Sequence, residues 1–182
     1  MGEPTFDERD LARARADDAI AGRRRERWLL AQADEESTVD GLVASLAADG
    51  RACRLELSNG RSAAGVPDVI GPGCVRVRDR SGATTFVRAD AIEAVRTTDT
   101  HERLATPDGA RTSTPMTLTD VLVELAADRP RVRIATAGGT VLTGELRRAG
   151  AEAITLGGDG TERDLIYIRL GSVLEVSLMT SG

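Results

Sequence analysis

The chain repeats itself at an interval of 79 residues, and this duplication restricts the possible folds more than any other feature of the sequence. The segment 38–49 aligns with 117–128, and the agreement continues well beyond it. After a two-residue insertion near Gly158 the interval becomes 81, so that Phe86-Val87-Arg88 aligns with Tyr167-Ile168-Arg169. Because glycines and apolar residues stay aligned over about sixty positions, the sequence predicts two units of the same structure. The aligned glycines are Gly60 with Gly139, Gly65 with Gly144 and Gly71 with Gly150.

Each repeat begins with a predicted amphipathic helix. Ser37 or Thr38 in the first repeat and Thr117 in the second are the expected N-caps, and Asp40 and Asp120 place negative charge in the first turn. The apolar residues are spaced i, i+3, i+4 and i+7, which gives each helix a single apolar stripe for packing. These residues are Val39, Leu42, Val43 and Leu46 in the first helix, and Leu118, Val121, Leu122 and Leu125 in the second.

Short strands are expected after each helix. Beyond Asp49 the apolar period changes to two, as in Cys53, Leu55 and Leu57, and the second repeat changes in the same way after Asp128. Tight turns are predicted at the Asn-Gly pair 59–60 and the Gly-Gly pair 138–139. Further strands are expected around residues 61–70, 74–79, 83–88 and 91–97, with counterparts in the second repeat.

A helix and five short antiparallel strands in about sixty residues favour a small closed or nearly closed barrel, because closure removes the strand edges. We therefore predict a mainly β protein with two five-stranded barrels, at residues 37–97 and 116–182, each preceded by its amphipathic helix. Residues 1–36 predict a charged N-terminal helix, and residues 98–115, which are rich in turn formers, predict a linker.

Composition excludes several kinds of functional site. The chain has a single histidine, His101 in the predicted linker, so a multi-histidine metal site is excluded and no cofactor is expected. Cys53 and Cys74 have no matching cluster of ligands and are expected to be reduced packing residues. The acidic N-terminus and the lack of a long apolar segment predict a cytoplasmic protein without membrane association.

Two motifs within each repeat resemble those of a known superfamily. The segment 55–66 is similar to the first Sm motif, an apolar strand, a turn ending in Gly60, and a second glycine, Gly65, five positions on. The segments 87–92 and 168–173 are similar to the second motif, in which an arginine follows an apolar residue. Each repeat therefore resembles a domain of the Sm-like superfamily, which includes the bacterial RNA chaperone Hfq, and the repeats cover about two thirds of the chain. The layout also resembles uncharacterised proteins of high-GC bacteria, whereas a small barrel of SH3 or PRC type would fit the strand pattern nearly as well.

The resemblance implies RNA association, but much of the usual binding surface is missing. The loops between the second and third strands, 71–74 and 150–153, hold small or acidic residues, and the Hfq-type Tyr-Lys-His near the fourth strand is absent. Arg88 and Arg169 are the residues that the resemblance carries over as RNA contacts, since a guanidinium can stack on a base or bind phosphate. The alternative is that both arginines make structural hydrogen bonds at a barrel rim. Ala89 and Leu170 stand where the family usually has glycine.

A second group of candidate nucleic-acid contacts lies in the N-terminal segment. The four arginines of this group could bind phosphates. However, the whole segment 1–36 has 7 arginines against 10 acidic residues, and a run of charges on a helix is commonly a solvated face. The net charge of −5 also argues against binding through overall charge. The residues of this group are Arg23, Arg24, Arg25 and Arg27.

Three functions follow from these features. The first is a non-catalytic Sm-like protein associated with single-stranded RNA. The second is a homo-oligomeric or protein-interaction scaffold, whose barrels associate through their edge strands and in which three chains would suit a six-barrel ring. The third, an enzyme, would need a cleft that gathers carboxylates such as Asp159, Glu162 and Asp164, but these lie in a predicted solvated turn, and no nucleophile and base are paired in the sequence. We therefore expect no enzymatic activity.

Overall fold

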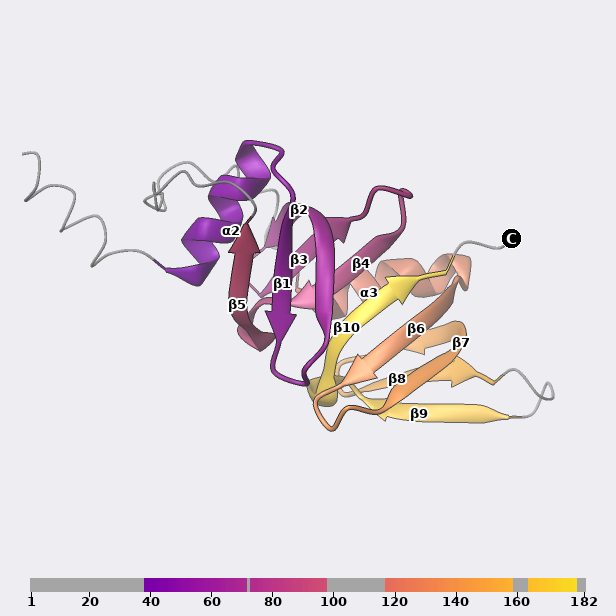
Figure 1. The fold of residues 1–182 in the computed structure, drawn as a ribbon. Helices are drawn as coiled ribbons and strands as arrows, with labels where there is room; N and C mark the ends of the chain where they lie inside the picture. Colours follow the sequence, from indigo (N-terminus) through magenta and orange to yellow (C-terminus); the bar gives the residue numbers. More distant parts are fainter. Residues whose placement is uncertain (1–37, 72, 98–116, 159–163, 180–182) are drawn as a thin grey trace, which may run out of the picture. The chain divides into compact units, whose positions relative to one another are not determined.

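The two aligned segments fold into equivalent series of elements (Figure 1). The structure is a computed structural model that describes residues 38–71, 73–97, 117–158 and 164–179, and the chain from Thr38 onward belongs to one compact unit. Several of the predicted features lie outside these described residues. They are the N-terminal helix at 1–36 with Arg23, Arg24, Arg25 and Arg27, the linker at 98–115 with His101, and the acidic residues Asp159 and Glu162.

The first repeat contains one helix and five strands, as the sequence predicts. Its elements are α2 (Val39–Ala48), β1 (Cys53–Leu57), β2 (Ser62–Gly71), β3 (Cys74–Arg78), β4 (Thr84–Arg88), the 3-10 turn η1 (Ala89–Ala91) and β5 (Ile92–Thr97).

The second repeat follows the same order. Its elements are α3 (Leu118–Asp128), β6 (Arg131–Thr136), β7 (Val141–Ala149), β8 (Ala153–Gly157), β9 (Leu165–Arg169), the 3-10 turn η3 (Leu170–Ser172) and β10 (Val173–Leu178). Each element begins within a residue of the position that the 79- and 81-residue intervals assign to it, so the structural duplication is confirmed.

Both helix N-caps are confirmed. The Thr38 side chain accepts a hydrogen bond from the Gly41 amide at 3.0 Å. Thr117 forms a capping box with Asp120, in which the Asp120 carboxylate accepts from the Thr117 amide at 2.8 Å. These contacts satisfy amide groups that have no partner within the helix, and they hold the start of each helix over its strands.

The expectation of two closed barrels is wrong, because the ten strands of the described residues form one open antiparallel sheet. The strand order is β5-β1-β2-β3-β4-β10-β6-β7-β8-β9, so the first five strands belong to the first repeat and the last five to the second. The fourth strand of the first repeat does not close on the fifth strand of its own repeat. It pairs instead with β10, which removes one exposed edge from each repeat as closure would have done.

Each repeat packs its helix against its own strands and has its own cluster of buried residues. The cluster of the first repeat includes Val43, Leu46 and Leu55, and that of the second includes Leu122, Ile134 and Leu156. Cys53 and Cys74 are both buried and free, as expected of packing residues. With so few aromatic residues in the chain, aliphatic side chains form nearly all of both clusters.

Candidate assembly interface

The two repeats meet along β4 and β10, where the strands pair in antiparallel register (Figure 1). Val87 lies opposite Glu175, Phe86 opposite Val176 and Thr85 opposite Ser177. We call this contact the internal junction. Because facing residues in such a pair lie on the same side of the sheet, the register decides which side chains of one repeat meet the core of the other.

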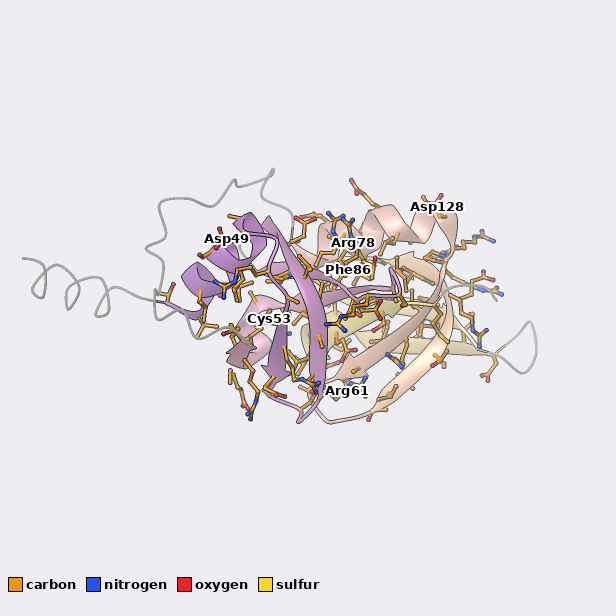
Figure 2. The ribbon with its side chains drawn as sticks, turned by 45° about the horizontal axis from the view of Figure 1, so that its top comes forward. Asp49, Cys53, Arg61, Arg78, Phe86 and Asp128 are labelled. Atoms are coloured by element: carbon orange, nitrogen blue, oxygen red, sulfur yellow. The ribbon has the colours of Figure 1, made fainter. Side chains whose placement is uncertain are left out.

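Phe86 carries the apolar part of the internal junction. It belongs to β4 of the first repeat (Figure 2). Its ring nevertheless packs in the buried cluster of the second repeat together with Leu118, Val121 and Val176. Only 6% of Phe86 is exposed. Cys74 of β3 packs in the same cluster. The first repeat thus completes the core of the second.

Polar contacts surround this apolar contact. Arg61 lies in the turn between β1 and β2 (Figure 2). Its guanidinium donates to the Glu175 carboxylate, with Nε 2.9 Å from Oε2. The Asn59 side-chain amide donates to the Thr136 carbonyl at 3.1 Å, and the hydroxyls of Thr85 and Ser177 are 3.1 Å apart. The hydrogen bond to Glu175 raises the pKa of Arg61 above its ordinary value.

Arg88 takes part in the internal junction as well. Its Nη1 donates to the carbonyl oxygen of Gly171 in the other repeat at 2.7 Å, and its Nε donates to Asp90 at 2.5 Å. These are structural hydrogen bonds of the kind that the sequence left open as the alternative to RNA contact. Arg169, its counterpart on β9, is exposed, and no hydrogen bond or ion pair joins its guanidinium to another described residue.

The sheet ends at two strands that correspond to the strands of the internal junction. Among the described strands, β5 and β9 have only one neighbour each. By the alignment, β9 is the counterpart of β4, and β5 is the counterpart of β10. One chain therefore presents at its two ends the same two edges that pair in its middle.

Tyr167 on β9 has no neighbouring repeat to cover its ring among the described residues. It is the counterpart of Phe86, yet 71% of it is exposed. Leu165 on the same strand is also exposed, and so is Ala153, the counterpart of the buried Cys74. The Tyr167 ring and the Leu165 side chain thus leave apolar surface uncovered on a strand that has one neighbour in the described sheet.

The opposite end of the sheet has a complementary apolar surface between α2 and β5. Val39 on α2 is 42% exposed. Its counterpart Leu118 on α3 is only 5% exposed, because it packs in the same buried cluster as Phe86. Val95 on β5 is half-buried, whereas its counterpart Val176 is fully buried. We call the surface formed by Val39, Leu42, Ile92 and Val95 the α2–β5 seam.

A groove of about 880 Å³ lies beside this end of the first repeat. Its lining includes four arginines together with small residues of β1 and β2. Two of the arginines pair with carboxylates of the same sheet, Arg96 with Glu56 at 2.8 Å and Arg78 with Asp68 at 3.6 Å. The four arginines are Arg54, Arg78, Arg80 and Arg96.

No protein-family model matches this chain, and neither a curated protein nor a solved structure is significantly similar to it. The described residues contain no cluster of three or more histidine, cysteine or acidic residues that could hold a metal ion. Among the same residues, no helix has both the length and the apolar character needed to cross a membrane.

Sequence reasoning did not single out the ion pair of the internal junction or the exposed ring on β9. Arg61 lies inside the first motif segment and Tyr167 directly before the second, but other residues carry the resemblance there, and Glu175 lies outside both motifs. A signal was nevertheless present in the alignment of the repeats. Arg61 aligns with Thr140 and Glu175 aligns with Ala94, so opposite charges occur at two positions where the other repeat has small uncharged residues.

Proposed function

We propose that this protein is a non-catalytic assembly unit, in which β9 of one chain pairs with β5 of the next. The observation that carries this proposal is the exposed ring of Tyr167, at the position where Phe86 fills the core of the neighbouring repeat. The two end strands, β9 and β5, are the counterparts of β4 and β10, which pair at the internal junction. The same pairing can therefore be repeated between chains. We call this contact the chain–chain junction.

The register of the chain–chain junction follows from that of the internal junction. Ile168 would lie opposite Ala94 of the next chain, Tyr167 opposite Val95 and Ile166 opposite Arg96. Tyr167 would then cover the α2–β5 seam as Phe86 covers Val176. A tyrosine suits this place because its ring can be buried while its hydroxyl stays in contact with water.

A contact between two different edges is heterologous, so it either closes into a ring or grows into a filament. Each chain contributes two repeats, and three chains would form a ring of six. The resemblance of both repeats to Sm-like domains, which associate edge to edge, supports closure. The expected mass is therefore about 58 kDa for three chains of 19.2 kDa.

Light scattering on the purified chain tests the proposal. We expect the mass of the assembly for the unmodified protein, and the mass of one chain for Tyr167→Asp, because a carboxylate at this position would have to be buried in the α2–β5 seam. Val123→Asp is the matched control, since Val123 is 50% exposed on α3 and belongs to neither junction. A single-chain mass for the unmodified protein at every concentration would refute the proposal, as would an unchanged assembly of Tyr167→Asp.

A second candidate function, association with single-stranded RNA, is favoured by the groove with four arginines. Guanidinium groups can stack on bases and bind phosphates, and small residues on the groove floor leave room for a base. Fluorescence anisotropy with labelled single-stranded RNA tests this function over a range of salt concentrations. We expect Arg80→Ala with Arg96→Ala to reduce the salt slope by about one per arginine, and Arg148→Ala, at an exposed site outside the groove, to cause less loss. An absence of binding at low salt with varied RNA sequences would exclude it.

A further inference from the structure

Glu175 is the most completely buried charge at the internal junction. Its side chain is 4% exposed, and among the described residues Arg61 and Ser177 donate hydrogen bonds to it. Arg61 donates through Nε to Oε2 at 2.9 Å and through Nη2 to Oε1 at 3.4 Å, while the Ser177 hydroxyl donates to Oε1 at 3.1 Å. When a buried carboxylate accepts two hydrogen bonds from one arginine, loss of that arginine leaves a buried charge uncompensated and destabilises the fold.

The equivalent positions of the chain–chain junction carry no charge. The 79-residue interval places Thr140 at the position of Arg61, and the 81-residue interval places Ala94 at the position of Glu175. Both Thr140 and Ala94 are exposed. The two junctions thus share one backbone arrangement, but only the internal junction depends on an ion pair.

We propose that the Arg61–Glu175 ion pair determines which strand edges pair, by joining β4 to β10 and excluding both strands from the chain–chain junction. The part that concerns chain–chain pairing rests on the proposed assembly, whereas the part that concerns β4 and β10 does not.

The exclusion follows from the cost of an unpaired buried charge. If β10 paired with β9 of another chain, Glu175 would face Thr140 and lose the guanidinium that neutralises it. If β4 paired with β5 of another chain, Arg61 would face Ala94 at little cost, but β10 would lose β4 as its neighbour and Glu175 would be left without a guanidinium. Only the pairing of β4 with β10 and of β9 with β5 leaves no charge without a partner. When the assembly dissociates, the chain–chain junction should accordingly open first, while β4 stays paired with β10 within each chain.

The internal junction can be tested whether or not the chain assembles. In Arg61→Glu two carboxylates would face each other, so we expect amide hydrogen exchange in β4 and β10 to become at least about tenfold faster, while β2 and β7 stay protected. The double variant Arg61→Glu with Glu175→Arg should restore protection, because the pair is re-formed with its charges exchanged. Unchanged exchange in Arg61→Glu, or a double variant no better than the single one, would overturn the proposal.

The chain–chain junction offers a test at exposed positions, where folding of the chain is not at risk. Ala94→Glu should raise the concentration at which the assembly is half dissociated by about a hundredfold, since it places a second carboxylate beside Glu56, and Arg96, which already pairs with Glu56, cannot neutralise both. Thr140→Arg should change it little, because an arginine head can reach water. The double variant should assemble again, as the two substitutions recreate the internal ion pair between chains.

The outcomes of these tests are separable. If the unmodified chain assembles but the double variant is no better than Ala94→Glu, the equivalence of the two junctions is wrong and the proposed assembly stands. If the unmodified chain never assembles, the proposed function fails, and hydrogen exchange in the Arg61 and Glu175 variants still decides whether the ion pair joins β4 to β10.

Discussion

Cys74 shows how strongly the surroundings of one side chain depend on the internal junction. It lies on β3 of the first repeat, but it is fully buried in the cluster of the second repeat beside Phe86. Its counterpart Ala153 is exposed. Burial raises the pKa of the Cys74 thiol to about 11, because the apolar surroundings disfavour the thiolate.

This shift predicts that the protein loses stability in alkaline solution. Above the ordinary thiol pKa of 9.0 the unfolded chain releases the Cys74 proton, while the folded chain keeps it until about pH 11. The unfolded state then binds fewer protons, so the free energy of unfolding falls across this window, by about 2–3 kcal/mol in total. Burial also raises the pKa of Cys53, which adds a change of the same sign. The chain contains no lysine, so no ammonium side chain titrates in the same range.

Urea unfolding at about pH 8 and about pH 10.5, in the unmodified protein and in Cys74→Ala, measures this effect. Cys74→Ala should lose clearly less stability between the two pH values, whatever its stability at the lower one. An equal loss in both proteins would show that the buried thiol is not the cause.

At the scale of the elements, the aligned glycines Gly65 and Gly144 have the same physical role. A Cβ on Gly65 would overlap the carbonyl oxygen of Arg78, and a Cβ on Gly144 would overlap that of Gly157. Arg78 and Gly157 are themselves counterparts, at the ends of β3 and β8. The backbones of neighbouring strands therefore approach closely at the same point in both repeats, where only glycine leaves enough space.

Gly144→Ala should therefore lower the free energy of unfolding by about 2–3 kcal/mol, because one of the two strands must shift. Gly138→Ala is the matched control in the same repeat, since a Cβ there would meet no atom within 4 Å. Urea unfolding midpoints of the two variants, compared at equal slope, measure the difference. Equal midpoints would contradict the close approach of β7 and β8.

The elements could be predicted from the sequence far better than their connection. Apolar spacing, threonine caps and paired glycines each depend on neighbours in the chain, and the helices and strands lie where these local patterns predict them. The pairing of β4 with β10 instead brings together residues far apart in the chain, such as Arg61 and Glu175, which are 114 residues apart. Local spacing contains no information about such a contact, and so closure of each repeat on itself was the expected result. The signal for the contact between β4 and β10 lies in the comparison of the two repeats, because Arg61 and Glu175 align with uncharged residues.

At the scale of the whole molecule, the duplication leaves each end strand of the described sheet, β5 and β9, with one free edge. Arg88 reaches the Gly171 carbonyl across the internal junction, and its counterpart Arg169 has no such partner among the described residues. In the proposed chain–chain junction the equivalent carbonyl would be that of Asp90 in the next chain, because Asp90 aligns with Gly171. The assembly would therefore use the arginine that the Sm-like resemblance assigns to RNA.

Arg169→Ala separates the two roles in one protein. If Arg169 joins chains, its removal deletes a charged hydrogen bond and should raise the concentration of half dissociation by about tenfold or more, with RNA affinity unchanged. If Arg169 contacts RNA, the mass should stay constant while the affinity falls and the salt slope decreases by about one. Light scattering and anisotropy on the same preparation measure both quantities. We expect the first result, because Arg88 makes the corresponding contact at the internal junction and its hydrogen bonds there go to protein groups.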